Sequence, residues 1–123
     1  FMVHGPESPG VLFHMPLGAE MENDWICGCI LHARAQGQGA VEPAPGVDVP
    51  WGEEVAAYAR QTLFEQTESW YTGANIEGKH RQFAVHTAGP LYFAKLQEVA
   101  AQGYPGLVFE PVGAGARAQA SGG

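Results

Sequence analysis

Apolar residues recur at helical spacing in three segments of the chain. The first segment begins at Ala19, repeats an apolar residue every three or four positions for roughly 17 residues and stops near Gly37. The second runs from about Pro50 to Phe64, and the third follows the turn 88–90 and ends at Gly103. The pattern predicts three amphipathic helices.

Short strands are predicted between and beside these helices. Residues 81–87 alternate apolar and polar side chains, and the segments 1–3, 40–42 and 107–109 are short, apolar and bounded by turn residues. We therefore predict an α/β fold with about three helices, short strands and long loops.

Two segments are predicted to be irregular. Residues 4–10 contain two prolines and two glycines, which neither a helix nor a strand tolerates, so they form a shaped loop. Residues 11–17 are apolar but lie between Pro9, Pro16 and Gly18, and we expect them to line a pocket or fill part of a core.

The segment Ser69–Lys79 concentrates chemical groups that bind ligands. It places an indole, a phenol, an amide and a lysine between glycines that permit close backbone approach. A lysine supplies a point charge suited to phosphate. From the residues alone, two interpretations stay open: a surface turn with aromatic side chains, or a loop that contacts a nucleotide.

Composition narrows the class of protein. The 123 residues suit one domain, and 46% hydrophobic residues suffice for a core, while 17 Gly and 9 Pro indicate many loops. The net charge of -7 argues against a nucleic-acid or anionic-membrane partner. No long apolar run or signal-peptide pattern occurs, so we expect a cytoplasmic protein.

Several other chemistries lack support in the sequence. The five histidines are not spaced to put two on one helical face, so no metal site is expected, and no Gly-x-Ser-x-Gly motif favours acyl transfer. The segment 113–118 matches a dinucleotide fingerprint only formally, because no helix and strand can follow it. Glu20, Glu22 and Asp24 are interpreted as a solvated first helical turn, and His4 and His14 as loop side chains bonded to backbone.

Three motifs in fixed order resemble a known family. They are Phe1-Met2-Val3-x-Gly5-Pro6-x-Ser8-Pro9, then Ser69-Trp70-Tyr71-x-Gly73-Ala74-Asn75-Ile76-x-Gly78-Lys79, then Glu98-Val99-Ala100-Ala101-x-Gly103-Tyr104-x-Gly106. Over residues 1 to about 110 the chain resembles the C-terminal region of flavin-dependent Baeyer-Villiger monooxygenases of the phenylacetone and cyclohexanone type. The resemblance implies an enzyme that uses FAD, NADPH and O2 to insert one oxygen atom beside a ketone.

The resemblance also implies roles for particular residues. Pro9, Gly10, Val11, Leu12 and Met15 match the family's substrate-lining bulge, and Met15 also matches the approach to the flavin. In the mobile loop that folds over the nicotinamide cofactor, the resemblance assigns cofactor-binding positions to Trp70, Asn75 and Lys79, with the indole of Trp70 bonding to the cofactor. Glu77 replaces the usual proline of this motif, and His14 takes a small polar position, which bears on fine specificity.

The resemblance predicts the domain organisation as well. Residues 1–111 are expected to be the C-terminal portion of an FAD-binding domain, with the cofactor-facing loop at 69–79 and a flexible tail at 112–123. The family's dinucleotide fingerprints, signature histidine motif and catalytic arginine would lie upstream of Phe1, so we expect a fragment that needs the upstream part to hold FAD and NADP. The alternatives are a free-standing binding or dimerisation module, with self-association through exposed helix faces, and a remnant without function.

Overall fold

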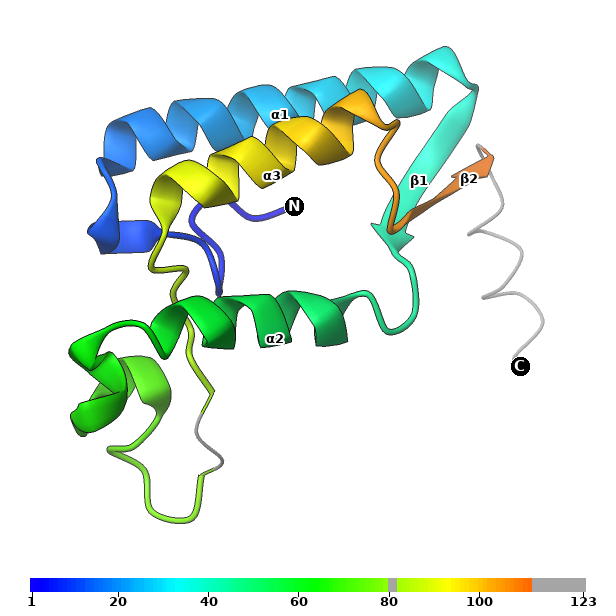
Figure 1. The fold of residues 1–123 in the computed structure, drawn as a ribbon. Coiled ribbons are helices and arrows are strands. Elements are labelled where there is room, and N and C mark those ends of the chain that lie inside the picture. The colour runs from blue at the N-terminus through cyan, green and yellow to red at the C-terminus, as the bar shows by residue number, and fades with distance from the viewer. Residues whose placement is uncertain (80–81, 112–123) are drawn as a thin grey trace, which may run out of the picture.

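A computed structural model describes residues 1–79 and 82–111 of the chain (Figure 1). Within these residues lie three α-helices and two strands: α1 (Met15–Ala35), β1 (Gln38–Pro43), α2 (Asp48–Ala59), α3 (Gly89–Ala101) and β2 (Leu107–Pro111). Short 3-10 turns occur at Gly10–Leu12, Leu63–Gln66 and Trp70–Thr72. The predicted mixed α/β class, with three helices, short strands and long loops, is confirmed. The predicted tail 112–123 lies outside the described residues.

Helix α1 begins earlier than the apolar repeat indicated. Its first residue is Met15, because the His14 side chain caps the helix by accepting a hydrogen bond from the Leu17 N–H (3.3 Å) and Pro16 suits a first turn. The expectation that Met15 and Leu17 lie in irregular structure is therefore wrong. At the other end, Gly37 adopts a left-handed φ of 69°, as predicted for a helix stop.

Helices α1 and α3 lie side by side and run in the same direction (Figure 1). The indole N–H of Trp25 on α1 donates to the carbonyl of Leu96 on α3 (2.8 Å). The buried Tyr104 ring, just past α3, packs against Trp25 and His32, with ring centroids 5.2 Å away in each case. Gly28 permits this approach, since a Cβ there would lie 2.8 Å from the Tyr104 hydroxyl.

The strands that follow these two helices pair with each other. β1 and β2 form a two-stranded antiparallel sheet in which Val41 faces Phe109, with an irregularity between Gln38 and Ala40. Figure 1 shows the sheet at the C-terminal ends of α1 and α3. The predicted strands 40–42 and 107–109 are thus confirmed and are each somewhat longer.

Helix α2 is shorter than predicted. It ends at Ala59, and Leu63–Gln66 forms a separate turn. The Thr62 hydroxyl causes the break by donating to the Ala59 carbonyl (2.7 Å) and accepting from the Phe64 N–H (3.3 Å). Across from α2, Phe83 and Val85 pack on Ala59 in a small buried cluster.

Two predicted strands are absent from the described structure. Residues 82–87 contain no strand, because their backbone groups bond to two loops instead of to a neighbouring strand. Residues 1–3 are also irregular and exposed, and Phe1 sets its ring edge against Trp25. None of the helices in residues 1–79 and 82–111 combines the length and apolar content needed to cross a membrane.

Candidate functional site

The loop from His4 to Leu12 is tightly wound. His4 and Glu7 adopt left-handed φ angles of 52° and 65°, and Gly10 has a φ of 49°. Such angles are unfavourable for residues with a Cβ and persist only where surrounding contacts hold them. Internal hydrogen bonds run from the Ser8 N–H to the Gly5 carbonyl (3.1 Å) and from the Leu12 N–H to the Pro9 carbonyl (3.0 Å). The loop therefore has one defined shape.

The residues predicted to bind substrate divide into buried and exposed groups. Pro9 is fully buried. A Cβ added at Gly10 would meet no atom within 4 Å, so its backbone is open to a ligand. Val11, Leu12 and Met15 expose 61%, 41% and 42% of their surface and present apolar groups on the turn and at the start of α1.

The loop Ser69–Lys79 presents the residues predicted to bind cofactor. The Ser69 hydroxyl accepts from the Tyr71 N–H (3.2 Å), and Gly73 closes the turn with a φ of 70°. Trp70 is 68% exposed and stacks on Tyr71, with ring centroids 3.9 Å apart. Asn75 is exposed, and so is Lys79, whose methylenes cross Gly73 closely enough that a Cβ there would lie 3.0 Å from Cδ.

The extended segment Gln82–His86 joins the two loops. On one side, the Glu7 N–H donates to the Ala84 carbonyl (2.8 Å) and the His86 N–H to the Ser8 carbonyl (3.1 Å). On the other side, the Ala84 N–H donates to the Tyr71 carbonyl (3.0 Å) and the Gln82 N–H to the Thr72 carbonyl (3.3 Å). The structure thus brings the backbones of both predicted site loops to one segment, while no described hydrogen bond joins Trp70, Asn75 or Lys79 to Val11, Leu12 or Met15.

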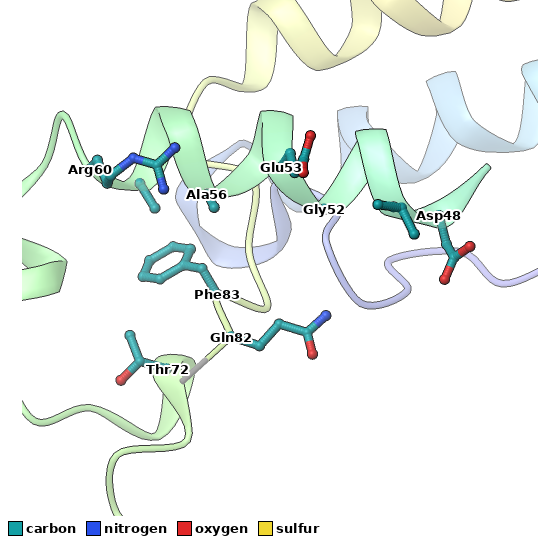
Figure 2. A pocket seen from close by; sticks show the side chains of 10 residues that line it. Asp48, Gly52, Glu53, Ala56, Arg60, Thr72, Gln82 and Phe83 are labelled. Atoms are coloured by element: carbon teal, nitrogen blue, oxygen red, sulfur yellow. The ribbon is translucent and has the colours of Figure 1, made fainter. Parts of the chain in front are cut away.

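A cavity of about 690 Å³ lies between α2 and the loop Ser69–Lys79, called the aromatic loop from here on (Figure 2). Figure 2 shows Glu53 and Ala56 on α2 and Arg60 directly after its last residue, with Phe83 and Thr72 across the opening. The residues lining it are Asp48, Val49, Gly52, Glu53, Ala56, Ala59, Arg60, Thr72, Gln82 and Phe83. None of the residues predicted to bind cofactor or substrate lines this cavity, and no motif in the sequence predicts it.

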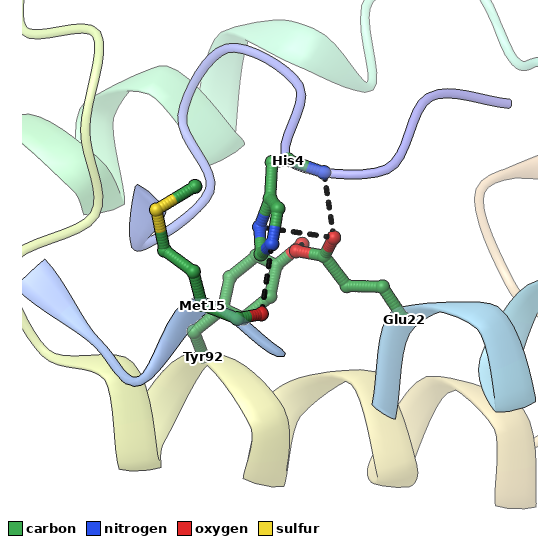
Figure 3. A network of polar contacts seen from close by, with 4 residues as sticks. All are labelled: His4, Met15, Glu22 and Tyr92. Carbon is green, nitrogen blue, oxygen red and sulfur yellow. Dashed lines mark hydrogen bonds and ion pairs between the residues drawn. The ribbon is translucent and has the colours of Figure 1, made fainter. Parts of the chain in front are cut away.

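A buried carboxylate connects the first loop to the helices (Figure 3). Glu22 on α1 is only 4% exposed, so the expectation of a solvated acidic turn is wrong for this residue. Its Oε2 accepts from the His4 N–H (2.7 Å), and its Oε1 accepts from the Tyr92 hydroxyl on α3 (3.2 Å). Burial, reinforced by the charge and hydrogen bond of Glu22, raises the pKa of Tyr92 well above its usual range.

The two loop histidines behave as predicted. The His4 Nε2–H donates to the Met15 carbonyl (3.0 Å), and His14 accepts from the backbone at the start of α1. Both imidazoles bond to the backbone and hold local structure.

A third histidine, His86, is buried among aromatic rings, which the sequence did not reveal. It is 1% exposed, and its ring lies among those of Trp51, Tyr58 and Tyr92 at centroid distances of 4.9 to 5.7 Å. Its Nδ1 accepts from the Ala88 N–H (3.1 Å), which puts the proton on Nε2, and Nε2 has no partner within residues 1–79 and 82–111. Burial lowers the pKa of His86, while Glu54 opposes that shift.

The sequence carried only weak signals for Glu22 and His86. Glu22 follows Met21 and precedes Trp25, so it lies close to the apolar face of α1. His86 occupies a polar position in the alternation of residues 81–87, where a strand would expose it, and only the packing of aromatic rings from α2 and α3 on that side buries it. Among the residues that the structure describes, no three His, Cys, Asp or Glu side chains gather closely enough to hold a metal ion.

The groups presented by the two loops suit a nicotinamide dinucleotide and an apolar molecule. Trp70 offers an exposed indole N–H that donates to no described residue, Asn75 an amide and Lys79 a cation. The other loop offers an open glycine backbone beside three exposed apolar side chains. The donors and the apolar wall therefore fit the cofactor and substrate classes that the sequence motifs imply.

Known proteins resemble this chain in both sequence and fold. It is 30% identical over 105 residues to cyclopentanone 1,2-monooxygenase of Comamonas sp. (strain NCIMB 9872), covering 85% of the chain and 19% of that protein. It is 32% identical over 109 residues to a Baeyer-Villiger monooxygenase of Pseudooceanicola batsensis, covering 88% of the chain and 20% of that protein. No family model matches the chain.

Solved structures give the same result. The closed crystal structure of cyclohexanone monooxygenase superposes with a TM-score of 0.79 at 37% identity, covering 91% of this chain and 21% of the other. Oxidized steroid monooxygenase bound to NADP superposes with a TM-score of 0.79 at 32% identity, covering 89% of this chain and 20% of the other. The chain is thus homologous to one segment of the flavin-dependent Baeyer-Villiger monooxygenases, which confirms the predicted resemblance. It spans about a fifth of the length of the relatives it matches.

Proposed function

We propose that residues 1–111 form the C-terminal portion of the FAD-binding domain of a Baeyer-Villiger monooxygenase. The whole enzyme would use NADPH and O2 to insert one oxygen atom beside a ketone, giving an ester or lactone. The observation that carries the proposal is the hydrogen-bonded connection of two loops through Ala84. One loop bears the residues expected near flavin and ketone, the other those expected near NADP. The cytoplasm stays the predicted compartment.

The loop 69–79 contributes cofactor binding. Trp70 would donate its indole N–H to the nicotinamide cofactor, and Asn75 and Lys79 would lie close to it, with the lysine charge favouring phosphate. Stacking on Tyr71 holds the indole in one orientation, which lowers the entropy lost on binding. When bound to the whole enzyme, NADPH supplies reducing equivalents and the flavin activates oxygen; the part of this chain would be to help bind and orient the two cofactors.

The loop 4–12 and the start of α1 contribute the substrate wall. Val11, Leu12 and Met15 would contact the ketone and exclude water, and Met15 would also approach the flavin. The open backbone at Gly10 permits close approach of a ligand, and the buried Pro9 would hold the turn beneath these side chains. No catalytic residue is assigned to this chain, because the catalytic arginine of the family belongs to another part of the enzyme.

Cofactor binding by the aromatic loop is tested in the enzyme reconstituted with its upstream part. Trp70→Ala and Trp70→Phe should each raise the KM for NADPH about tenfold, equivalent to roughly 1.4 kcal/mol of binding. FAD content, measured from flavin absorbance, should not change. Trp51→Phe is the matched control, since Trp51 lies on α2 with its ring against His86 and Tyr92 and outside the loop 69–79. Unchanged NADPH kinetics in both Trp70 variants would contradict the assignment.

One observation agrees equally with the alternative of a free-standing binding or dimerisation module. Large apolar side chains are exposed on helices and loops alike, and they include Leu17, Ile30, Leu31, Val49, Leu63, Trp70, Ile76 and Leu91. Either another part of an enzyme or a second copy would cover them. Size-exclusion chromatography with flavin absorbance separates the two. A folded, flavin-free dimer supports the module, whereas aggregation that is rescued by adding the upstream part supports the monooxygenase.

A further inference from the structure

The first loop, His4–Leu12, contains strained backbone angles. Within residues 1–79 and 82–111, only His4, Glu7 and Tyr104 are non-glycine residues with positive φ. His4 and Glu7 enclose the Gly5-Pro6 corner, so two of these three angles fall in one short loop. Since a left-handed φ is unfavourable for a side chain with a Cβ, contacts outside the loop must hold His4 in place.

Two contacts from α1 hold His4: its Nε2–H donates to the Met15 carbonyl (3.0 Å), and its backbone N–H donates to Glu22 (Figure 3). The Glu22 Oε2 accepts from the His4 backbone N–H at 2.7 Å, a short bond of the charge-assisted kind, and lies 3.5 Å from Nδ1 of the same residue. Its Oε1 accepts from the Tyr92 hydroxyl at 3.2 Å. One carboxylate on α1 thus bonds simultaneously to the loop backbone and to α3.

Packing between the helices does not require this carboxylate. Trp25 already bonds to the Leu96 carbonyl, and Phe93 and Tyr104 are buried between α1 and α3. A charged group is costly to bury unless it is fully bonded, and both oxygens of Glu22 have partners. What Glu22 adds to the helix packing is its bond to the His4 backbone N–H in the first loop. This bond points to a role in loop geometry.

We propose that Glu22 is a positioning residue that fixes the loop His4–Leu12 and so sets where Val11, Leu12 and Met15 stand relative to a bound ketone. The part that concerns the ketone rests on the proposed function, whereas the part that concerns the loop does not.

The loop position is tested first in the chain itself by amide hydrogen exchange. Glu22→Met fills the space without an acceptor, and it should raise exchange at the His4, Glu7 and Ser8 amides by about tenfold or more relative to the helix α1 amides. Glu22→Gln retains an acceptor and should stay within about threefold of the unaltered chain. Glu20→Ala, an exposed acid on the same helix, is the matched control and should change none of the three.

A second variant keeps the test decisive in case Glu22→Met does not fold. Glu22→Met combined with Tyr92→Phe leaves no unpaired tyrosine hydroxyl and should show the same loop-specific increase. The proposal is overturned if either folded variant leaves exchange at the three loop amides unchanged, or raises it no more than at Trp25 and Cys29 in the middle of α1.

The second measurement concerns the reconstituted enzyme. Glu22→Met should raise the KM for the ketone about fivefold or more, with the KM for NADPH and the FAD content within about twofold of normal, and Glu22→Gln should restore the ketone KM. A parallel change in both KM values contradicts the assignment to the substrate wall. If the exchange result holds but no ketone oxidation can be reconstituted with any variant, the proposed function fails while the positioning role of Glu22 stands.

Discussion

The pair α1–α3 and the two loops that carry the predicted site are built in different ways. Cys29 on α1, Phe93 on α3 and Tyr104 just past α3 are buried, and the Tyr104 ring packs against Trp25 of α1. The loops bury few apolar side chains, and backbone hydrogen bonds to Gln82–His86 hold them. Their large apolar residues, such as Val11, Trp70 and Ile76, point outward. Rigidity in the helices therefore comes from packing, and in the loops from bonded backbone shape.

This difference shows how one small segment can support binding without being a complete site. The helices provide a fixed base, and Glu22 and His86 lie where the loops meet that base. The exposed loop side chains are left available for ligands or for another part of an enzyme. Substitutions should accordingly separate into those that unfold the base and those that loosen only the loops.

The largest effect is expected from the helix base. Phe93→Ala should lower the free energy of unfolding by about 3–5 kcal/mol, because Phe93 is buried against Phe13 and Tyr92 and its loss leaves a cavity. Leu91→Ala, on the exposed side of the same helix, should change it by no more than about 0.5 kcal/mol. Urea denaturation followed by circular dichroism measures both, and equal effects would remove the distinction between base and surface.

The next largest effect is expected where Phe13, just after the first loop, packs against the start of α3. A Cβ at Gly89 would lie 2.6 Å from the Phe13 ring, so Gly89→Ala should destabilise the protein by about 1–3 kcal/mol. In α2, a Cβ at Gly52 would come no closer than 3.8 Å to another residue, and Gly52→Ala should stabilise it by about 0.5–1 kcal/mol. Thermal melting of both variants provides the measurement, and opposite signs are the expected result.

Stability should fall as the pH drops below 6.5, the ordinary pKa of histidine. Burial lowers the pKa of His86 in the folded state, so the unfolded chain binds the proton first and is favoured as the pH falls. One proton gives a slope of at most about 1.4 kcal/mol per pH unit. Denaturation curves recorded between about pH 5 and 8, the range in which histidines titrate, should show this fall in the free energy of unfolding. The His86→Phe variant should not show it. An identical slope in His86→Phe would assign the titration elsewhere.

The smallest effect is expected at the bond between the loops that lies in solvent. The Gln82 side chain donates to Glu7 at 3.2 Å in an exposed position, so Gln82→Ala should cost less than about 1 kcal/mol. Amide exchange should nevertheless rise at Glu7 and Ala84, whose backbones meet there. Gln61→Ala, which removes an exposed bond within one segment, is the control and should leave both amides unchanged.

Local patterns predicted the helices and the paired strands well. The apolar repeat located α1, α2 and α3, and glycines placed the ends of α1 and α3, because both signals depend on neighbours a few residues away. The boundaries that failed depended on single side chains: the His14 cap extended α1, and the Thr62 hydroxyl ended α2. The strand expected at 81–87 failed because its partners are loop residues far away in the sequence.

By itself, the sequence determined the mixed α/β class, the positions of the helices and the family resemblance, since periodicity and motif spacing are properties of the chain alone. Only the tertiary structure decided that Glu22 is buried while Glu20 is exposed, that His86 lies among three aromatic rings, and that Gln82–His86 joins the two site loops. The physical reason is that burial and hydrogen bonding of a polar group depend on partners brought from distant positions, as Tyr92 is brought to Glu22.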